Sequence, residues 1–369
     1  MFVLFWEEDL LPAAPWRHGS FAERNSMANP PLISPLQEEG SPRPFWSVMI
    51  PTYNPQPHYL EETLRGILLQ DPGPEQMQIE VIDDGSTDNT ASEVVRRIGA
   101  GRVAFHAERQ NRGLANTWNL CVERARGNWV HILHQDDIVL PGFYERLYGG
   151  IVCNPHIGMA FCRFAIIDAN GHWKEIAPLE STTAGVLNNW LERVATGYHV
   201  ECPAVAVKRA TYERLGGFRA ELTFALDLEM WVRIAANATV YYEPQILAGF
   251  RRYGGNESAM QERTGASMQD MARAIKVWKD YLPANSKEQL EQQGRRHWAG
   301  VSLILAQRFF SNDDVAACAS QLRAAKDLWN RGKYRSRRLQ LEAKVLLFRA
   351  FGRRAISAVR ELRRRIQPA

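Results

Sequence analysis

Short apolar runs alternate with longer stretches of helical periodicity between residues 46 and 135, and this alternation restricts the folds open to the chain. The strand-like runs are 46–51, 77–83, 102–107 and 128–135. The helical stretches between them are 60–70, 90–98 and 114–125. Such alternation is typical of βαβ units, which build a mostly parallel sheet with helices on both faces. We therefore predict an α/β fold of Rossmann-like type whose ligands bind at the carboxyl ends of the strands.

The pattern changes on both sides of this region and divides the chain into three parts. Residues 1–45 are rich in Pro, Ser and Glu without a sustained period, so a mostly disordered leader is expected there. After Pro141 the alternation loosens. The further elements expected are helices near 142–152, 186–195 and 226–236 and strands at 157–167 and 199–208. From about residue 265 the periodicity is helical only, which predicts an α/β domain at 46–262 and a helical region at 263–369.

Composition and charge limit the expected cellular location of the protein and the classes of partner it can bind. No stretch reaches the roughly 18–20 apolar residues of a membrane span, and Glu7, Glu8 and Asp9 interrupt the apolar start of the chain. Five cysteines without a C-x-x-C pair fit a reduced cytoplasm. Of the net charge of +4, residues 331–369 carry 13 Lys/Arg against two acids, so the rest of the chain is mildly acidic. That distribution argues against a nucleic-acid partner.

Polar and acidic residues follow the strand-like runs directly. Thr52 ends the first run, Asp83 and Asp84 end the second, and Asp136 and Asp137 follow the fourth. Carboxylates that converge in one crevice are costly unless a cation or several donors neutralise them. Oxygen ligands of this kind suit Mg²⁺ or Mn²⁺. The alternative is turn and helix-cap chemistry, for which Asp-Gly-Ser-Thr-Asp is well suited.

An ordered set of motifs makes a family resemblance specific. IPTYN, VIDDGSTDNT, the N-R-G-L-A-x-x-W-N spacing at 111–119 and GNWVHILHQDDIVLPGFYERL resemble glycosyltransferase family 2, and the likeness covers about 47–260. This resemblance implies the GT-A fold and inverting transfer from a nucleotide-diphosphate sugar, with a UDP- or dTDP-sugar expected. The residues it assigns to the donor nucleotide are Pro51, Thr52, Tyr53, Asp83, Asp84, Asn111, Gly113, Asn116 and Gln135.

The resemblance also implies a divalent cation, Mn²⁺ or Mg²⁺, held between the enzyme and the donor diphosphate. Asp136 falls on the last position of the family's D-x-D motif, and Asp137 is expected to share the ligation. His134 replaces the first Asp of the motif, so that the sequence reads His-Gln-Asp-Asp. His134 is therefore either a further contact to the metal site or a histidine that only ends the strand.

Two further motifs lie after residue 220. The segment D-L-E-M-W resembles the D-x-[DE]-x-W helix start that supplies the catalytic base, which implies Asp227 in that role, with Glu229 as the alternative. Asp227 could otherwise serve only as a helix N-cap. The segment F-R-R-Y-G-G resembles a loop that closes over the diphosphate, which implies contacts from Arg251 and Arg252. A solvated basic loop is the alternative there.

The terminal segment 337–369 has one apolar stripe flanked by arginines. The stripe consists of Leu341, Val345, Phe348, Ala355, Val359, Leu362 and Ile366. It predicts a helix that lies on an anionic membrane surface, packs on the catalytic domain or forms a homodimer. The chain is thus expected to be cytoplasmic and peripheral to the inner membrane face, and to glycosylate a hydroxyl acceptor such as a lipid-linked glycan in polysaccharide or glycolipid assembly.

Other protein classes fit the sequence less well. The first strand is followed by neither G-x-G-x-x-G nor a P-loop, which disfavours a dehydrogenase and an NTPase. A nucleotidyltransferase could share the α/β core, but Pro51-Thr52-Tyr53-Asn54 carries no basic residue for a phosphate loop. A catalytically degenerate, transferase-like scaffold is the alternative outside enzymes.

Overall fold

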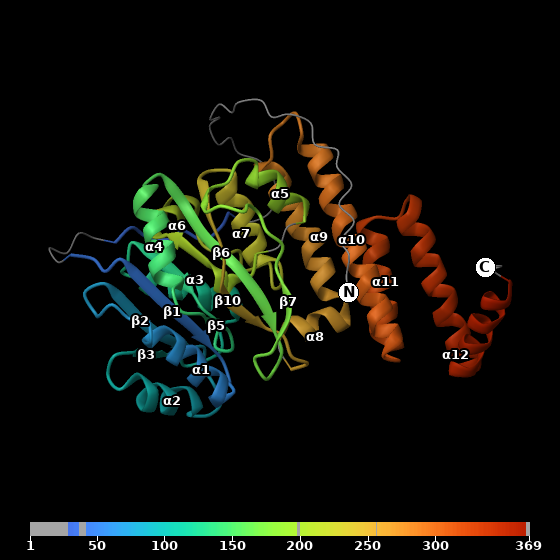
Figure 1. Ribbon diagram of the computed structural model, residues 1–369, viewed down its shortest axis with the longest axis horizontal. Coiled ribbons are helices and arrows are strands. Elements are labelled where there is room, and N and C mark those ends of the chain that lie inside the picture. Colours follow the sequence, from blue (N-terminus) through green and yellow to red (C-terminus); the bar gives the residue numbers. More distant parts are fainter. Residues whose placement is uncertain (1–28, 37–41, 198–199, 256, 367–369) are drawn as a thin grey trace.

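A computed structural model describes residues 29–36, 42–197, 200–255 and 257–366, with side-chain surroundings up to residue 350. A central sheet lies between helices, and a helical region extends away from it along the longest axis (Figure 1). The strands are β1 (Trp46–Thr52), β2 (Met77–Asp83), β3 (Ala104–Ala107), β4 (Trp129–Ile132), β5 (Ile138–Val139), β6 (Ile157–Ile167), β7 (Trp173–Ile176), β8 (Gly185–Val186), β9 (Val205–Lys208) and β10 (Thr239–Arg251).

Helices cover the sheet and form the extension. Those of the first half are α1 (Pro57–Leu68), α2 (Thr90–Gly99), α3 (Leu114–Arg124), α4 (Phe143–Cys153), α5 (Trp190–Thr196), α6 (Arg209–Leu215) and α7 (Leu226–Ala235), with the 3₁₀ turn η1 (Cys202–Ala204). Those that follow are α8 (Glu257–Thr264), α9 (Ala266–Trp278), η2 (Lys279–Tyr281), α10 (Lys287–Ser311), α11 (Val315–Leu328) and α12 (Gly332–Ile366). Within the described part of the chain, no helix is both long and apolar enough to cross a bilayer.

The strand order places a topological switch point at the centre of the sheet. The order is β3-β2-β1-β4-β9-β6-β10-β5, with β7 on β6 and β8 on β10. β1 pairs in parallel with β2 on one side and with β4 on the other, so the chain reverses its direction of winding there. β9 runs antiparallel to both β4 and β6. The predicted α/β class with a mostly parallel sheet is confirmed, and such sheets bind ligands where the winding reverses.

The burial of each strand explains whether it could be predicted from the sequence. Every residue of β1 and β2 is buried, as expected for parallel strands covered on both faces, and such strands read as continuous apolar runs. β10 was not predicted as one strand because Pro244 interrupts it, and its register with β6 shifts between Glu243 and Ile246. Proline has no N–H to donate, so within a strand it is confined to edges and to irregular positions such as this one.

Two of the predicted boundaries do not hold. Residues 1–28 and 37–41 of the leader lie outside the described part, but Ile33 is buried in the core and the Ser34 carbonyl accepts a hydrogen bond of 3.2 Å from Arg209. Residues 29–36 are therefore part of the folded body. The core also runs across the boundary at residue 262, because Met271 of α9 and Trp298 of α10 belong to the same apolar cluster as the sheet. A sequence pattern shows the change to helices but not what those helices pack against.

Candidate functional site

The carboxyl ends of β1, β2 and β4 lie side by side at one edge of the sheet, where the sequence predicts the donor site. Thr52 and Asp83 are register partners, and the Asp84 N–H donates to the Thr52 carbonyl at 2.8 Å. Asn54, in the left-handed region at φ 43°, joins the loops that follow β1 and β2. Its N–H donates to Ser86 Oγ at 2.8 Å, and its side-chain oxygen accepts from the Thr87 N–H at 2.8 Å. Hydrogen bonds therefore hold the two loops together.

The two acidic residues after β2 hold different backbone segments. Asp83 accepts hydrogen bonds from the hydroxyl and the N–H of Ser86, which fixes its own turn. Asp84 accepts from the Arg112 N–H at 2.8 Å and from the Gly113 N–H at 3.1 Å. Both carboxylates are nearly fully buried, so Asp84 fastens the 111–113 loop to the end of β2. The spacing of these motifs thus has a structural cause as well as the binding role implied by resemblance.

The other residues assigned to the donor surround this corner. Gln135 links β1 to the end of β4, since its side-chain oxygen accepts from Thr52 Oγ1 at 2.5 Å and from the Tyr53 N–H at 2.9 Å. Pro51 is buried in β1, whereas the Tyr53 side chain is 43% exposed at the mouth of the crevice.

The loop after β3 completes this corner. The Asn111 side chain accepts from the Gly113 N–H at 3.1 Å, and Asn116 is exposed in α3. A cavity of about 580 Å³ lies at the end of β3, and its lining residues are His106, Ala107, Glu108, Arg109, Gln110 and Arg112. Since Arg112 lines this cavity and its N–H donates to Asp84, the cavity borders the loop that Asp84 holds.

His134 has a defined environment of its own. Its ring stacks on Trp118 of α3, with centroids 4.9 Å apart and an interplanar angle of 26°. Nδ1 lies 3.1 Å from Asp137 Oδ2. Burial opposes a charge on the imidazole, but contacts with Cys202 and the Asp137 carboxylate raise the pKa of His134 well above its ordinary value. The histidine is thus packed and paired, and Trp118 gives a physical reason for the Trp of the 111–119 motif.

The two carboxylates after β4 differ in access. Asp137 is fully buried, and its Oδ1 accepts from the Arg251 N–H at 2.8 Å while Oδ2 contacts His134. Burial raises the pKa of Asp137 to about 6. Asp136 is half-buried, and burial raises its pKa although His134, the Tyr253 hydroxyl and Arg251 lower it. Both oxygens of Asp137 contact the protein, so Asp136 is the more accessible carboxylate of the two, and metal ligation by Asp137 stays a prediction.

A cation at Asp136 would need ligands from the substrate. Among the described residues, no group of three or more His, Cys, Asp or Glu side chains is arranged to hold a metal ion. Mg²⁺ is commonly held by one or two carboxylates together with substrate phosphates, and one half-buried carboxylate fits that arrangement. The residues present thus suit a cation shared with a diphosphate and do not suit a cation held by the protein alone.

The predicted contact of Arg251 with a diphosphate stays a prediction, and its side chain has partners within the protein. The side chain is 1% exposed, and its guanidinium donates to the Asp136 carbonyl at 2.7 Å and to Glu62 at 2.6 Å. It also lies over the Tyr59 ring at 4.5 Å. A guanidinium with these partners fixes the end of β10 to α1 and to the Asp136 loop. Arg252, which remains one-third exposed, forms an ion pair with Glu262.

Asp227 lies in the first turn of α7 and not at its N-cap, which is Ala225. Its side chain is largely buried, and Oδ1 accepts from the Leu228 N–H at 2.7 Å. Glu229 is fully buried, pairs with Arg233 at 2.8 Å and accepts from the Tyr281 hydroxyl at 2.7 Å. These contacts hold Glu229 in a buried ion pair, which favours Asp227 over Glu229 as the candidate base.

Two residues that the sequence did not single out belong to this region. Cys202 of η1 is buried, and burial is the main reason why the pKa of its thiol is raised. The charges of Asp227 and Asp137 also raise this pKa, whereas His134 lowers it. The thiol is therefore within electrostatic reach of both the β4 corner and the α7 helix. Asp270 of α9 accepts three backbone hydrogen bonds from residues 223–225, directly before α7. Neither residue is part of a recognisable motif. Their partners lie far away in the sequence, so no local pattern could point to these contacts.

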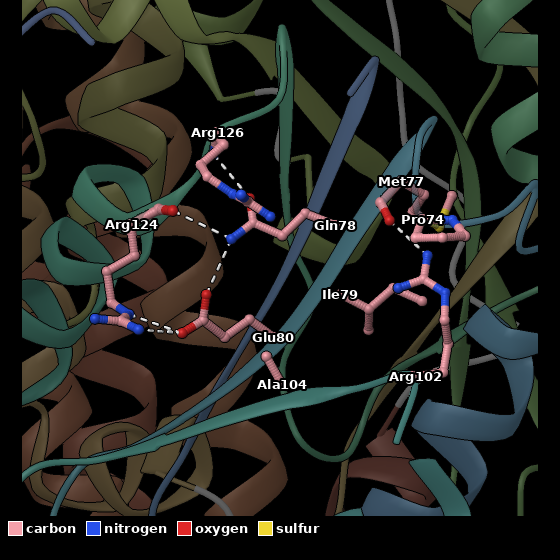
Figure 2. Close-up of a pocket in the computed structure, with 9 residues that line it drawn as sticks. All are labelled: Pro74, Met77, Gln78, Ile79, Glu80, Arg102, Ala104, Arg124 and Arg126. Atoms are coloured by element: carbon pink, nitrogen blue, oxygen red, sulfur yellow. Dashed lines mark hydrogen bonds and ion pairs between the residues drawn. The ribbon is translucent and has the colours of Figure 1, made fainter. Parts of the chain in front are cut away.

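A second cavity, of about 430 Å³, lies at the opposite, amino end of β2. Figure 2 shows Gln78, Glu80 and Arg124 grouped together, while Arg102 lies apart from them and points to the Met77 carbonyl. Glu80 pairs with Arg124 at 2.5 Å, and Gln78 donates to the Arg124 carbonyl at 3.2 Å. Arg102 forms two hydrogen bonds with Asp71, at 2.6 and 2.8 Å. The Glu80 and Gln78 contacts fasten β2 to α3, and Arg102 joins the segment before β3 to the loop after α1. This cavity is therefore separate from the carboxyl ends of the strands.

Comparison with known proteins identifies the family. The family model for glycosyl transferase family 2 matches residues 47–204. An uncharacterized glycosyltransferase of Haemophilus influenzae is 30% identical over 233 residues, which cover 59% of this chain and 68% of that protein. The minor teichoic acid biosynthesis protein GgaB of Bacillus subtilis is 30% identical over 105 residues, 28% of this chain and 11% of GgaB. The chain belongs to glycosyltransferase family 2.

Solved structures show the same fold. S. aureus TarS 1–349 in complex with UDP-GlcNAc aligns with a TM-score of 0.59 at 18% identity, over 83% of this chain and 91% of that one. The mannosyltransferase PcManGT of Pyrobaculum calidifontis, in complex with GDP-Man and Mn²⁺, aligns with a TM-score of 0.53 at 20% identity, over 87% and 88% of the two chains. The GT-A fold expected from the motifs is therefore confirmed, and the protein is a glycosyltransferase by family.

Proposed function

We propose that the protein transfers a sugar, with inversion, from a nucleotide-diphosphate sugar to a hydroxyl acceptor with the help of a divalent cation. The observation that carries this proposal is the meeting of Asp83, Asp84 and Asp136 at the switch point of the sheet. Parallel sheets bind ligands at this position, and an accessible carboxylate beside ordered loops suits a nucleoside diphosphate with its cation. We infer a UDP- or dTDP-sugar as the donor.

The nucleoside end of the donor is proposed to occupy the side of the crevice near β3. The 580 Å³ cavity there is bounded by the loop that Asp84 holds, and Tyr53 is exposed nearby as an aromatic surface for a base or ribose. TarS in complex with UDP-GlcNAc and PcManGT in complex with GDP-Man support a nucleotide-sugar ligand. The loops are joined to each other before any ligand binds, which lowers the ordering cost of binding.

The cation is proposed to sit between Asp136 and the donor diphosphate. When bound, Mn²⁺ or Mg²⁺ would offset the negative charge that develops on the departing nucleoside diphosphate. The protein's part is to present one carboxylate at a fixed place: Arg251 holds the Asp136 carbonyl, and Tyr253 contacts the Asp136 side chain. The PcManGT complex with Mn²⁺ supports this use of a cation.

Asp227 is proposed as the general base. An acceptor hydroxyl must lose its proton as it attacks the anomeric carbon, and a positioned carboxylate can accept that proton. Asp227 lies in the first turn of α7, and Asp270 holds the backbone just before it. The buried ion pair of Glu229 with Arg233 supports Asp227 over Glu229 in this role.

The acceptor is proposed to be a precursor of a cell-surface polysaccharide or glycolipid. The likeness to GgaB, named as a minor teichoic acid biosynthesis protein, supports this class of acceptor over a short stretch. The sequence after Asp137, where the acceptor is expected to bind, follows no motif that names a particular sugar.

A donor panel with and without Mn²⁺, read by thermal shift and by nucleoside-diphosphate release, tests the proposal. A tight donor raises the melting temperature with the logarithm of its concentration. Asp136→Asn should remove the dependence on Mn²⁺. Asp227→Asn should slow transfer by about 10²–10⁴-fold while donor binding is kept, and Glu145→Gln, an exposed acid on α4, should behave as wild type.

The possible outcomes separate the alternatives. No donor that binds or reacts would favour a degenerate scaffold. Release of pyrophosphate in place of a nucleoside diphosphate would indicate a nucleotidyltransferase. Loss of donor affinity in Asp227→Asn would remove Asp227 from the role of base without removing the donor site.

A further inference from the structure

The terminal helix α12 has an inner face that is already occupied. Leu341 and Val345 are buried, and with Phe348 they pack against Leu303 of α10 and Leu322 of α11 in a separate apolar cluster. These are the described members of the apolar stripe that the sequence offered for a membrane or a homodimer. The structure therefore assigns that part of the stripe to packing within the chain, and Ala355, Val359, Leu362 and Ile366 lie outside the side chains described.

The opposite face of α12 is also apolar, and it is exposed. Leu339 is 47% exposed and Leu346 is 66% exposed. Ala343 and Ala350 are exposed as well. At 100° per residue these four positions fall within one narrow sector, because they recur at steps of four, three and four residues. Exposed leucines aligned in this way differ from the scattered surface leucines of an ordinary globular protein.

Cations border this outer face. Arg335 and Arg349 flank the two leucines along one side, and Lys333 lies on the other side; all three side chains are exposed. The segment 331–369 contains 13 Lys/Arg and two acids, a net charge of +11, whereas the whole chain carries +4. One of the two acids, Glu342, is paired with Arg338 within the helix. The surface around the stripe is thus strongly positive.

We propose that the outer face of α12 docks the enzyme on an anionic phospholipid surface, with Leu339 and Leu346 entering the headgroup boundary. An apolar stripe between basic side chains is what an interfacial helix requires, and each Lys or Arg near such a surface adds attraction. A second copy of the chain is the poorer occupant, because self-association through this face would bring two segments of charge +11 together.

The position of α12 in the molecule suits this role. The helix lies at the end of the long axis away from α2 and β3 (Figure 1). It continues to Ile366, and the sequence of its last part adds Arg353, Arg354, Arg360 and the run 363–365. Contact through this end would leave the loops after β2 and β3, which border the donor crevice, free of the lipid surface.

The test is flotation of the full-length protein with vesicles of phosphatidylcholine alone or with phosphatidylglycerol added, at low and at high salt. Wild type should bind the anionic vesicles and lose most of that binding at high salt. The double variant Leu339→Asn/Leu346→Asn should bind at least tenfold more weakly. The double variant Arg335→Gln/Arg349→Gln should bind about 30-fold more weakly, if each arginine contributes about 1 kcal/mol.

Matched variants elsewhere make the result specific. Leu69→Asn replaces a leucine that is 83% exposed directly after α1, and Arg96→Gln/Arg146→Gln removes the same charge from α2 and α4. Both variants should bind as wild type. Deleting 337–369 is less informative, because it would uncover the α10–α11 surface that Leu341 and Val345 cover. Donor binding should be unchanged in every variant, so this inference and the proposed function fail independently.

Three results would overturn the inference. The first is equal vesicle binding by wild type and both α12 variants. The second is no binding of wild type to anionic vesicles at low salt. The third is a concentration-dependent dimer, seen by analytical ultracentrifugation without lipid and abolished by Leu339→Asn/Leu346→Asn, which would make this face a protein interface.

Discussion

Asp270 is the residue whose removal should report most clearly on how α7 is held. It belongs to α9 and is 1% exposed. Its Oδ2 accepts backbone hydrogen bonds from Thr223 at 2.9 Å, from Phe224 at 2.8 Å and from Ala225 at 3.0 Å. These three N–H groups belong to the residues directly before α7, whose N-cap is Ala225, so Asp270 fixes the entry of the chain into this helix. We predict that Asp270→Ala lowers the stability of the protein and misplaces the first turn of α7.

The size of the effect follows from these contacts. A hydrogen bond to a charged group contributes about 1.5–3 kcal/mol, but the three bonds share one oxygen and are not additive. Asp270→Ala should therefore cost about 3–5 kcal/mol, a large part of a typical total stability of about 5–15 kcal/mol. Asp270→Asn keeps an acceptor oxygen and loses only the charge, so it should cost about 1–2 kcal/mol.

Urea unfolding measures these differences as shifts of the midpoint at unchanged slope. Asp280→Ala, an exposed acid on η2 with one weak ion pair of 3.8 Å, is the matched control and should change stability by no more than about 0.5 kcal/mol. In the proposed mechanism Asp270→Asn should also lower kcat more than it changes the KM of the donor, because α7 carries Asp227. A loss below about 1 kcal/mol in Asp270→Ala would refute the reasoning.

Two further predictions concern other parts of the chain. Burial raises the pKa of Glu180 to about 7 despite its ion pair with Arg193, so the folded protein binds the proton more tightly than the unfolded chain, and stability falls as the pH rises from about 4.5 to 7. Glu180→Gln should therefore raise the melting temperature, relative to wild type, more at pH 8 than at pH 5. The difference should be equivalent to at most about 3 kcal/mol of unfolding free energy. An equal change of the melting temperature at both pH values would contradict this. Gly85 has φ +70°, and an added Cβ would lie 2.6 Å from the Gln110 backbone, so Gly85→Ala should displace the loop after β3 and weaken donor binding at least about tenfold. Gly73→Ala, with φ +106° and no atom within 4 Å of the added Cβ, is the control for backbone strain alone, and equal donor affinity in the two variants would refute the contact argument.

The sequence determined the core of the fold. Strands buried on both faces must be apolar throughout, and helices that cover them must be apolar on one side, so both patterns are local and legible. The element bounds at 77–83 and 157–167 agree with the structure to the residue. The carboxylates that follow β2 and β4 were found for the same reason, because strand ends in a parallel sheet share one edge.

The tertiary structure decided which of those carboxylates and arginines are accessible. Asp136 and Asp137 are neighbours in the sequence, yet only Asp137 meets the Arg251 N–H and is fully buried. Arg251 was assigned to a diphosphate, but Glu62, 189 residues away, pairs with its guanidinium.

The helical region after residue 262 required the structure for the same reason. Asp270 supports α7 from a segment that the sequence set apart as a separate region. On α12 the inner stripe proved to be packing, while the outer leucines, Leu339 and Leu346, proved to be the exposed ones. A periodic pattern fixes which residues share a face of a helix, but only the packing of distant elements decides whether that face meets protein or solvent.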